Sequence, residues 1–458
     1  MKSFAARFVI WYLRFIVHIA LAINRPYIIG IAGSTGKSST RNAIYSVIKD
    51  YYPTKFIFGN SEVGVPLGLL GITPGNYSFF DWARMLILAK FKIFNLVGVK
   101  YLVVEMGIDD PNPPKNMGYL LTIIKPDIAI SINVSATHTM QFEKLLLEKE
   151  KGRANFDFLL SKIAEEDTKI IKESGAAIGI YNADDKYVSA QIKNFNSPTT
   201  KVLSFGENKE NNISYKRYRA DLQGTTFVFI TGKDELRLDF KTFVFPEIYR
   251  EVFAPSILAL QNIGLTNLQI KTSLEENFQL PKGRGEIFKG IKNSIIIDSS
   301  YNASKAAVNA FLELAQNLKK STNGKIVFLF GDMRELGGEA ESEHLEVSEK
   351  INEIVDFLYL VGPLTKKYVE PHIKNLKDVK WFENSIEAGI YIKTNLPKNA
   401  IFLAKGSQNE LFLEEAVKHL LLYKKDQKKL CRQAPGWIDK KNKYFKKFGL
   451  SLNPSSSQ

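Results

Sequence analysis

The chain has 458 residues, a formal net charge of +14 and a single cysteine, Cys431. This length exceeds what one hydrophobic core normally covers, so we expect two or three domains, and 45% hydrophobic with 24% charged residues is typical of globular proteins. One cysteine excludes an internal disulfide framework and any zinc site built from several cysteines. The positive charge favours anionic partners but does not choose among nucleotides, nucleic acid and an acidic membrane face.

The first segment, Phe4–Ile23, is rich in apolar and aromatic residues but is interrupted by Arg14 and His18. With Arg7 these residues are seven and four positions apart, close to one helical face, so the spacing predicts an amphipathic helix rather than a membrane span. We see no small-residue cleavage site, which argues against a removed signal peptide. Packing on the protein's own surface, a place in the membrane interface and a true span stay open, and the basic apolar stretch 82–100 has similar character.

A phosphate-binding pattern follows at once. The apolar run Tyr27–Ile31 predicts a buried strand, Gly33–Ser39 a glycine turn and Thr40–Ile48 a helix. Glycines let backbone N–H groups surround phosphate oxygens, Lys37 neutralises the outer phosphates, and the Ser38 hydroxyl is placed for Mg²⁺. The general P-loop pattern has glycine at position 31, where this chain has isoleucine, so only its second half is met. The alternative is an ordinary strand, turn and helix.

Two further strand ends supply candidate ligands at the same sheet edge. Glu105 ends the apolar run Tyr101–Val104, where a carboxylate is costly unless it is paired or binds metal, and Mg²⁺ prefers oxygen ligands. The run Ile128–Ile132 leads into a loop that carries His138, one of only five histidines. We therefore expect Glu105 and His138 near the phosphates. A salt-bridged strand end and a structural loop histidine are the alternatives.

Apolar strand-like runs alternate with helical patterns from residue 25 onward, as expected for mostly parallel α/β sheets. The runs are 27–32, 101–105, 128–132, 177–181, 294–297, 325–330, 357–361 and 401–404. Short alternating segments between 200 and 245 predict an antiparallel insert or edge. The basic, glycine-rich stretch 281–285 separates the two series. The expected domains are an amphipathic helix (1–24), a central P-loop domain (25–280), a C-terminal domain (281–435) and a basic, polar tail (436–458).

From residue 25 to about 435 the chain resembles the Mur ligases, the ATP-dependent amide-bond-forming enzymes of peptidoglycan synthesis. The motifs that carry the resemblance are Gly33–Ser39, 60–66, 105–107, 133–138, 181–185, 283–284, 298–303, 331–337 and 405–407. Asp-x-x-Tyr-Asn-Ala at 298–303, with Gly-Asp-Met-x-Glu-Leu-Gly at 331–337, looks most like the branch that adds D-alanyl-D-alanine to a UDP-muramyl tripeptide. The resemblance implies a P-loop central domain and a Rossmann-like α/β C-terminal domain.

In that family the substrate carboxylate attacks the γ-phosphate of ATP, and the incoming amine then displaces phosphate from the acyl phosphate. The resemblance assigns ATP to Gly33, Ser34, Thr35, Gly36, Lys37, Ser38, Ser39, Asn182, Asp298 and Asn302. It assigns Mg²⁺ to Ser38, Glu105 and His138. Arg284 would reach the phosphates from the linker between the domains. Lys405 and Ser407 would face the incoming amino component, with Asp332 and Glu335 as candidates near its ammonium.

Two departures limit this transfer. Many Mur ligases carry a carbamylated lysine for the second metal in the helix after the histidine loop, and here Asp167 aligns with it, so a native carboxylate would serve the same electrostatic purpose. A solvated acidic helix face and a competing alignment through 149–153 are the alternatives. The second departure is that only about 24 residues precede the P-loop strand, so the family's N-terminal UDP-binding domain is not expected.

The sequence therefore predicts a cytoplasmic, ATP- and Mg²⁺-dependent ligase that adds D-alanyl-D-alanine to a muramyl peptide. Two alternatives stay open. One is a ligase acting on another carboxylate, either a lipid-linked muramyl peptide, with peripheral contact at the inner membrane face, or a folate-like polyglutamate. The other is an ATP-binding partner subunit that does not ligate. Nucleic-acid binding is not expected, because no recognised nucleic-acid module accompanies the charge. The basic run 424–447 is expected to be solvated.

Overall fold

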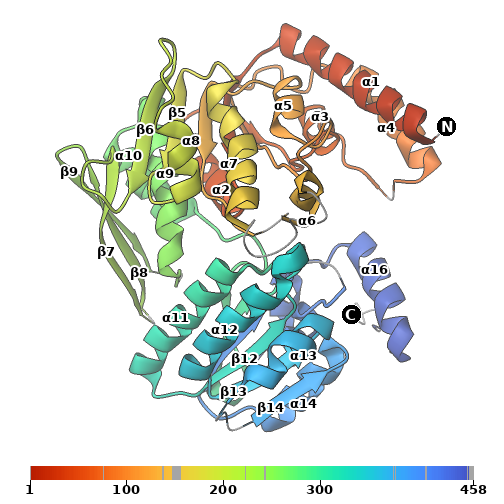
Figure 1. Ribbon diagram of the computed structural model, residues 1–458, viewed down its shortest axis with the longest axis vertical. Helices are drawn as coiled ribbons and strands as arrows, with labels where there is room; N and C mark the ends of the chain where they lie inside the picture. The colour runs from red at the N-terminus through yellow and green to blue at the C-terminus, as the bar shows by residue number, and fades with distance from the viewer. Residues whose placement is uncertain are drawn as a thin grey trace. The chain divides into compact units, whose positions relative to one another are not determined.

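The computed structural model describes residues 2–75, 77–136, 139–146, 156–221, 223–241, 244–374, 376, 378–407, 410–450 and 452. The chain divides into two compact units. The N-terminal unit comprises residues 1–217, 227–238 and 249–279. The C-terminal unit comprises residues 218–226, 239–248 and 280–458. One sheet lies mainly in the N-terminal unit and the other in the C-terminal unit, and helices pack against each (Figure 1).

The sheet of the first half has the strand order β2-β3-β1-β4-β5-β6-β7-β8-β9. Its strands are β1 Tyr27–Ala32, β2 Thr54–Phe56, β3 Tyr101–Glu105, β4 Ile128–Ser131, β5 Ile178–Asn182, β6 Lys201–Gly206, β7 Ile213–Asp221, β8 Gly224–Thr231 and β9 Asp234–Phe240. From β2 to β6 neighbouring strands are parallel. Ile31 of β1 is in register with Glu105 of β3 and with Ile130 of β4, so the carboxyl ends of these three strands meet at one edge.

Helices surround this sheet and supply most of the apolar core. They are α1 Lys2–Ile23, α2 Lys37–Ile48, α3 Gly64–Leu69, α4 Phe79–Phe91, α5 Met117–Leu121, α6 Thr139–Phe142, α7 Phe156–Lys172, α8 Lys186–Ile192, α9 Arg250–Asn262 and α10 Asn267–Asn277, with short 3₁₀ turns η1 Glu143–Leu145 and η4 Glu247–Tyr249. Helix α2 packs against β3 and α9, and α7 packs against β4. The central strands β1, β3 and β4 are almost wholly buried, as expected for parallel strands covered on both faces.

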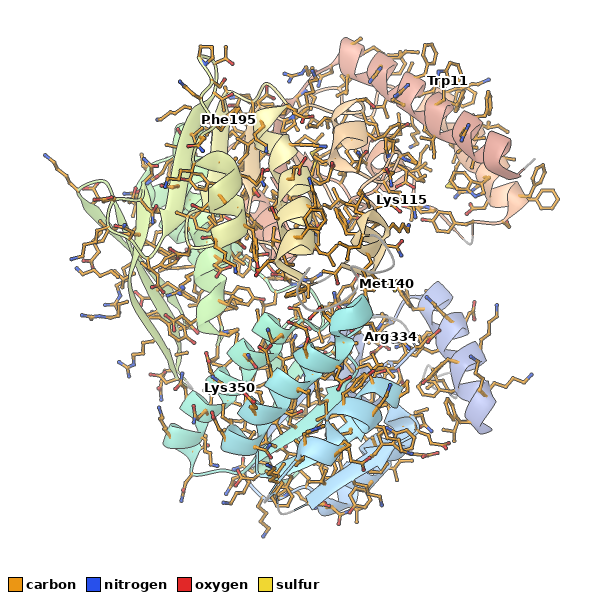
Figure 2. All side chains as sticks on the ribbon, viewed as in Figure 1. Trp11, Lys115, Met140, Phe195, Arg334 and Lys350 are labelled. Carbon is orange, nitrogen blue, oxygen red and sulfur yellow. The ribbon has the colours of Figure 1, made fainter. Side chains whose placement is uncertain are left out.

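The helix expected in the N-terminal segment is present as α1, but its outward side is apolar rather than polar. It packs on α3 and α4 through a buried stripe formed by Leu13, Ile16, Val17 and Ala20. Trp11, labelled in Figure 2, lies on the opposite, outward side of the helix. Because one stripe meets the protein and the other meets solvent, the helix belongs to the surface of the N-terminal unit.

The C-terminal sheet has the order β10-β11-β15-β12-β13-β14. Its strands are β10 Glu286–Lys289, β11 Ile295–Ser299, β12 Ile326–Gly331, β13 Phe357–Val361, β14 Asp378–Phe382 and β15 Ile401–Lys405. Only the β10–β11 pair is antiparallel among the described strands of this sheet. Ser299 and Phe330 are both in register with Lys405, so polar residues that end or follow β11, β15 and β12 gather at one edge. The expected α/β class with two mostly parallel sheets is confirmed.

The helices of this unit are α11 Lys305–Thr322, α12 Ala340–Ile354, α13 Pro363–Tyr368, α14 Ser385–Asn395, α15 Glu414–Lys418 and α16 Pro435–Phe445. Its 3₁₀ turns are η5 Ile291–Asn293, η6 Gly337–Glu339, η7 Glu370–His372, η8 Lys424–Lys429 and η9 Lys446–Phe448. Helix α16 differs from the solvated basic segment expected there, because Lys441 and Phe445 are fully buried. This helix is therefore an integral part of the C-terminal unit.

Candidate functional site

The loop between β1 and α2 has backbone angles that require glycine. Gly33 and Gly36 have φ angles of 131° and 88°, which L side chains rarely adopt. A Cβ atom on Gly33 would also lie 3.1 Å from both the backbone nitrogen and the carbonyl oxygen of Asn133. Gly36 immediately precedes α2, whose first-turn N–H groups have no intrahelical partners. The loop and helix end together present the N–H groups and partial positive charge that bind phosphate.

Asn133, the second residue after β4, fixes the shape of this loop. Its backbone oxygen accepts from the Ser34 N–H (2.8 Å), and its Oδ1 accepts from both the N–H (3.0 Å) and the hydroxyl (3.1 Å) of Thr35. Its Nδ2 donates to Oε2 of Glu251 (3.1 Å), and burial raises the pKa of Glu251. The Ser135 N–H donates to the Ser34 hydroxyl (3.0 Å). Sequence reasoning placed Asn133 in a motif but gave it no role, although its position after β4 was the available signal.

Lys37 and Asp167 lie on the inner side of the loop. The Lys37 ammonium donates to the carbonyl of Gly33 and to that of Ser34, the latter at 3.2 Å. Asp167 comes from α7 and is 2% exposed. Burial raises the pKa of Asp167 to about 7, although nearby Lys37 opposes the shift. The carboxylate expected to stand in for a carbamylated lysine is thus buried near Lys37, and its part in metal binding stays a prediction.

Glu105, at the end of β3, is held by two residues of α2. The Ser38 hydroxyl donates to Oε2 at 2.9 Å, and Nη1 of Arg41 lies 2.6 Å from Oε1. Both Glu105 and Arg41 are buried, and the Arg41 guanidinium stacks over the Phe56 ring with its central carbon 4.5 Å from the ring centroid. Sequence reasoning missed Arg41. Its place one helical turn after Ser38, on the α2 face toward β3, fixes which way the Glu105 carboxylate points.

The Ser38–Glu105 pair fits a magnesium site of the kind that relies on substrate phosphates. Mg²⁺ takes oxygen ligands and often uses only one or two protein carboxylates beside phosphates and water. Among the residues that the structure describes, no group of three or more histidine, cysteine, aspartate or glutamate side chains could hold a metal ion. Thr137 and His138 lie outside the described residues, as do residues 149–153, so the role of His138 stays a prediction.

The remaining nucleotide candidates of the N-terminal unit are buried. Ser39 lies in the first turn of α2 and is 4% exposed. Asn182 ends β5, and its Oδ1 accepts from the Asp184 N–H at 2.9 Å. Asp185 caps α8 and also accepts from the Val134 N–H at 2.7 Å, which ties the loop after β4 to the turn after β5. Asn182 therefore shapes this turn.

In the C-terminal unit, Asp298 is the penultimate residue of β11, Lys405 is the last residue of the neighbouring β15, and both are buried. Asp298 Oδ1 accepts from the Ser300 N–H at 3.1 Å, and burial raises the pKa of Asp298 to about 6. The Lys405 ammonium donates to the Ser299 hydroxyl and to the Asn302 carbonyl, both at 3.0 Å. Burial lowers the pKa of Lys405 to about 7. Two oppositely charged groups with strongly shifted pKa values at one sheet edge are typical of a functional site.

Arg284 and Asn302 lie in the loops beside this pair. The Arg284 guanidinium stacks over the Tyr301 ring, 4.8 Å from its centroid. The Gly283 carbonyl accepts from the Tyr301 N–H (3.0 Å), and the Gly283 N–H donates to Glu286 (3.1 Å), whose pKa burial raises to about 7. Asn302 Oδ1 accepts from the N–H of the next residue at 2.8 Å. These contacts hold the stretch before β10 against the turn after β11.

Asp332 and Ser407, expected near an incoming amine, have side-chain oxygens engaged in turns. Asp332 Oδ1 accepts from the N–H groups of Leu364 (3.0 Å) and Thr365 (2.9 Å) at the start of α13. Burial raises the pKa of Asp332 to about 6. The Ser407 hydroxyl accepts from the Arg334 N–H (2.8 Å), and the Ser407 N–H donates to the Asp332 carbonyl (2.9 Å). Both residues therefore shape the loops after β12 and β15.

Glu335 follows in the same loop, is exposed, and has a φ of 66°. Beneath this loop lies His344 of α12, which is fully buried and which sequence reasoning did not single out. Its Nε2 accepts from the Met333 N–H (3.1 Å), and its Nδ1 donates to the Ala340 carbonyl (2.5 Å). Burial lowers the pKa of His344, which favours the neutral ring that this pattern needs.

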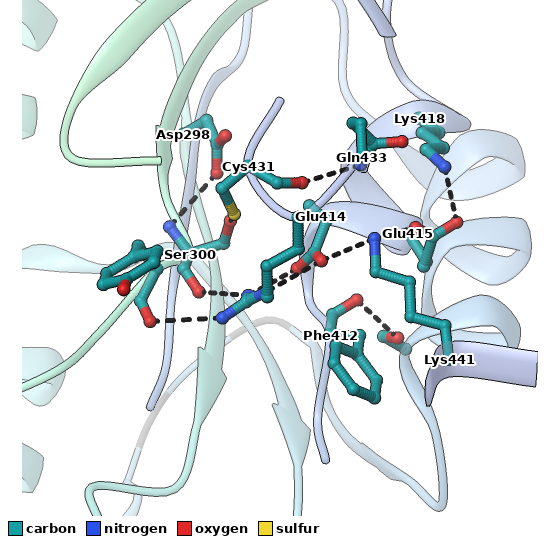
Figure 3. A network of polar contacts seen from close by, with 12 residues as sticks. Asp298, Ser300, Phe412, Glu414, Glu415, Lys418, Cys431, Gln433 and Lys441 are labelled. Carbon is teal, nitrogen blue, oxygen red and sulfur yellow. Dashed lines mark hydrogen bonds and ion pairs between the residues drawn. The ribbon is translucent and has the colours of Figure 1, made fainter. Parts of the chain in front are cut away.

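A buried ion network joins the turn after β11 to Arg432 and to Lys441 of α16 (Figure 3). Arg432 binds both oxygens of Glu414, at 2.9 and 2.5 Å, and donates to the Ser300 carbonyl at 2.8 Å. Lys441 of α16 lies 2.7 Å from both Glu414 and Glu415. Although burial alone would raise it, the pKa of Glu414 is lowered by Arg432 and Lys441. The network was not predicted from the sequence.

Two family models match the chain. The model described as Mur ligase middle domain matches residues 155–245, and the model described as Mur ligase, glutamate ligase domain matches residues 283–408. Among curated relatives, the UDP-N-acetylmuramoyl-tripeptide–D-alanyl-D-alanine ligase of Buchnera aphidicola is 26% identical over 399 residues, which is 85% of this chain and 75% of the relative. The Bacillus subtilis enzyme of the same name is 25% identical over 404 residues, covering 86% and 76%.

Solved structures share the fold. The MurF ligase from Thermotoga maritima in complex with ADP matches with a TM-score of 0.70 at 20% identity, covering 92% of this chain and 84% of that chain. The folylpolyglutamate synthase from Mycobacterium tuberculosis, complexed with ADP and AMPPCP, matches with a TM-score of 0.59 at 12% identity, covering 88% and 94%. At these identities the structural similarity shows a shared fold and nothing about substrates.

Proposed function

Since this chain belongs to the Mur ligase family and is an ATP-dependent ligase of that type, we propose that it joins D-alanyl-D-alanine to the carboxylate of a UDP-muramyl tripeptide in peptidoglycan synthesis. The names of its curated relatives support this choice of substrates. The observation that carries the use of ATP is the Gly33–Gly36 loop with the Ser38–Glu105 pair at its helix end. We propose a cytoplasmic location, where ATP and nucleotide-linked precursors are available.

In the first half-reaction an oxygen of the substrate carboxylate attacks the γ-phosphorus, and the bond to the bridging oxygen breaks to release ADP. The loop N–H groups and Lys37 bind the phosphates, with Lys37 exchanging its contacts to Gly33 and Ser34 for phosphate oxygens. Ser38 and Glu105 would hold Mg²⁺, which when bound neutralises charge on the phosphates. Arg41 holds one Glu105 oxygen and leaves the other directed toward Ser38.

In the second half-reaction the amine nitrogen attacks the acyl carbon, inorganic phosphate leaves, and the nitrogen loses a proton. We propose that Lys405 binds the carboxylate of the amino component. An ammonium has three donors; Ser299 and Asn302 take two of those of Lys405, the Phe311 ring centroid lies 5.0 Å from its nitrogen, and we propose that the third donor serves the substrate. Asp332 and Glu335 stay candidates near the substrate ammonium, with Ser407 shaping the same loops. Arg284 and Asp298 are proposed nucleotide contacts of this unit.

The test is phosphate release from ATP and Mg²⁺ in the presence of UDP-N-acetylmuramoyl-tripeptide and D-alanyl-D-alanine, with mass spectrometry of the product. We expect ligated product that requires both substrates and is lost in Lys37→Ala. The matched control is Lys49→Ala, an exposed lysine just after the same helix. Phosphate release with a different carboxylate or amine, but none with this pair, would overturn the substrate assignment and leave ligase chemistry intact. Product formed only with a lipid-linked muramyl peptide would redirect the acceptor to the membrane.

A further inference from the structure

The outward side of α1 is a continuous apolar and aromatic stripe. Its exposed residues recur every three or four positions: Phe8 (50% exposed), Trp11 (51%), Phe15 (50%), Ile19 (36%) and Ile23 (43%). The rings of Trp11 and Phe15 stack, with centroids 5.7 Å apart and planes 8° apart. A helix that packs only on its own protein has no need for aromatic residues on its solvent side, because these residues cost solubility there.

The neighbouring α4 segment extends this surface. Helices α1 and α4 lie side by side in the N-terminal unit, and the Tyr12 hydroxyl donates to the Leu86 carbonyl at 3.0 Å (Figure 1). The α4 segment exposes Phe79, Phe80, Ile87, Phe91, Phe94 and Val97, each more than half exposed. We call these residues and the α1 stripe together the α1–α4 face.

The charges within the α1 and α4 segments are almost all positive. The chain has no acidic residue before Asp50, and α4 contains only Asp81, which is ion-paired with Arg84 at 2.7 Å. The basic residues of the two segments whose side chains the structure describes are Arg7, Arg14, Arg84, Lys90, Lys92 and Lys100. Exposed aromatic rings in segments that also carry lysine and arginine match the boundary between acyl chains and anionic headgroups. This complementarity identifies one kind of partner, a lipid surface.

The packing of α1 favours a helix that lies on a bilayer over one that crosses it. Residues Ala6–Ile23 are long and apolar enough for a span by composition. However, Arg14 donates to the Thr122 hydroxyl (3.1 Å), and the His18 Nε2 lies within hydrogen-bonding distance of the Thr122 carbonyl (2.8 Å). Crossing a bilayer would break these contacts, uncover the buried stripe through Leu13 and Val17, and place Arg14 in hydrocarbon.

We propose that the α1–α4 face docks the protein peripherally on membranes that contain anionic lipids, with α1 parallel to the bilayer at headgroup depth. The docked surface belongs to the N-terminal unit and is formed by residues with no assigned part in ATP binding. The proposal goes beyond the ligase activity and does not depend on which acceptor the enzyme uses. It holds whether the acceptor is soluble or lipid-linked.

The first test is flotation of the full chain with phosphatidylcholine vesicles, with and without phosphatidylglycerol. We expect binding to the anionic vesicles that weakens as salt is raised, because the basic residues contribute electrostatically. The double variant Trp11→Ser, Phe15→Ser should lower the partition coefficient by at least about tenfold. The matched control is Leu268→Ser, Ile390→Ser, two apolar residues that are 73% and 53% exposed elsewhere, which should bind as the native chain does. Retained binding of an ATP analogue shows that the variants are folded.

The second test places Trp11 at the bilayer. Brominated phospholipids should quench part of the tryptophan fluorescence of the native chain, and Trp11→Phe should lose that part while still floating. Three outcomes would overturn the proposal: no flotation of the native chain, equal flotation of the double variant, or unchanged quenching in Trp11→Phe. A dimer by light scattering that the double variant dissolves, without vesicle binding, would show instead that a second copy covers this face.

Discussion

Replacing Asn133 with alanine should weaken ATP binding by about 5- to 30-fold while leaving the fold intact. The substitution removes the acceptor of the Thr35 N–H and hydroxyl and the amide donor to Glu251, three hydrogen bonds of 3.0–3.1 Å. A buried polar group that loses its partner costs about 1–3 kcal/mol. Thr35 is only partly buried and its hydroxyl can rotate, so about 1–2 kcal/mol is expected, which gives the stated range. The Ser34 contact to the Asn133 backbone remains in the variant.

Titration of a fluorescent ATP analogue measures this effect without any acceptor substrate. The matched variant Asn133→Asp keeps the acceptor for Thr35 but sets a second carboxyl opposite Glu251, whose pKa burial already raises. Its affinity loss should be small at low pH, where one carboxyl is protonated, and should grow as rising pH ionises both. An Asn133→Ala affinity within twofold of the native value would refute the idea that this side chain orders the phosphate loop. A pH-independent Asn133→Asp would refute the carboxyl repulsion.

Two further substitutions test the other contacts. Arg41→Met should lower kcat by about 10- to 100-fold with little change in KM for ATP, because Glu105 loses a charged partner 2.6 Å away, worth about 1.5–3 kcal/mol. Phosphate release measures this, with the exposed Arg25→Met as control, and a larger effect on KM than on kcat would contradict it. Asp332→Asn should raise the melting temperature at pH 8 but much less at pH 4. The native pKa is raised from 3.8 to about 6, so the native chain loses up to about 3 kcal/mol as pH rises through that interval, and asparagine does not. Equal shifts at both pH values would contradict the assignment.

The parts of the site predicted from the sequence are those set by local pattern. An apolar strand, glycines and a following helix specify the β1 loop and α2 within about twenty residues. Glu105 could be placed beside them because parallel strands align their carboxyl ends, and the structure indeed pairs it with Ser38. The two-sheet α/β architecture followed from the same alternation of strands and helices.

The contacts that hold the site could not be predicted from the sequence, because they join side chains that are distant in the chain. Asn133 contacts Thr35 across 98 positions, and Arg41 meets Glu105 only because α2 packs on β3. Counting charges treats every lysine between 424 and 447 alike, so the whole run was predicted to be solvent-exposed. Lys441 is instead buried beside two glutamates. Pairing of this kind depends on three-dimensional packing, which composition does not encode.

The Glu414–Arg432–Lys441 network shows that the folded C-terminal unit extends beyond the residues matched by the family model. The matched family region stops at residue 408, yet the counterions of Glu414 come from positions 432 and 441. A protease cut or engineered stop before α16 would remove Lys441, the buried cation shared by Glu414 and Glu415, and leave these carboxylates with Arg432 and Lys418 alone, which should destabilise the unit. Lys441 of α16 thus supplies a buried counterion to the unit. Fusion partners or reporter tags should therefore be attached after the end of α16.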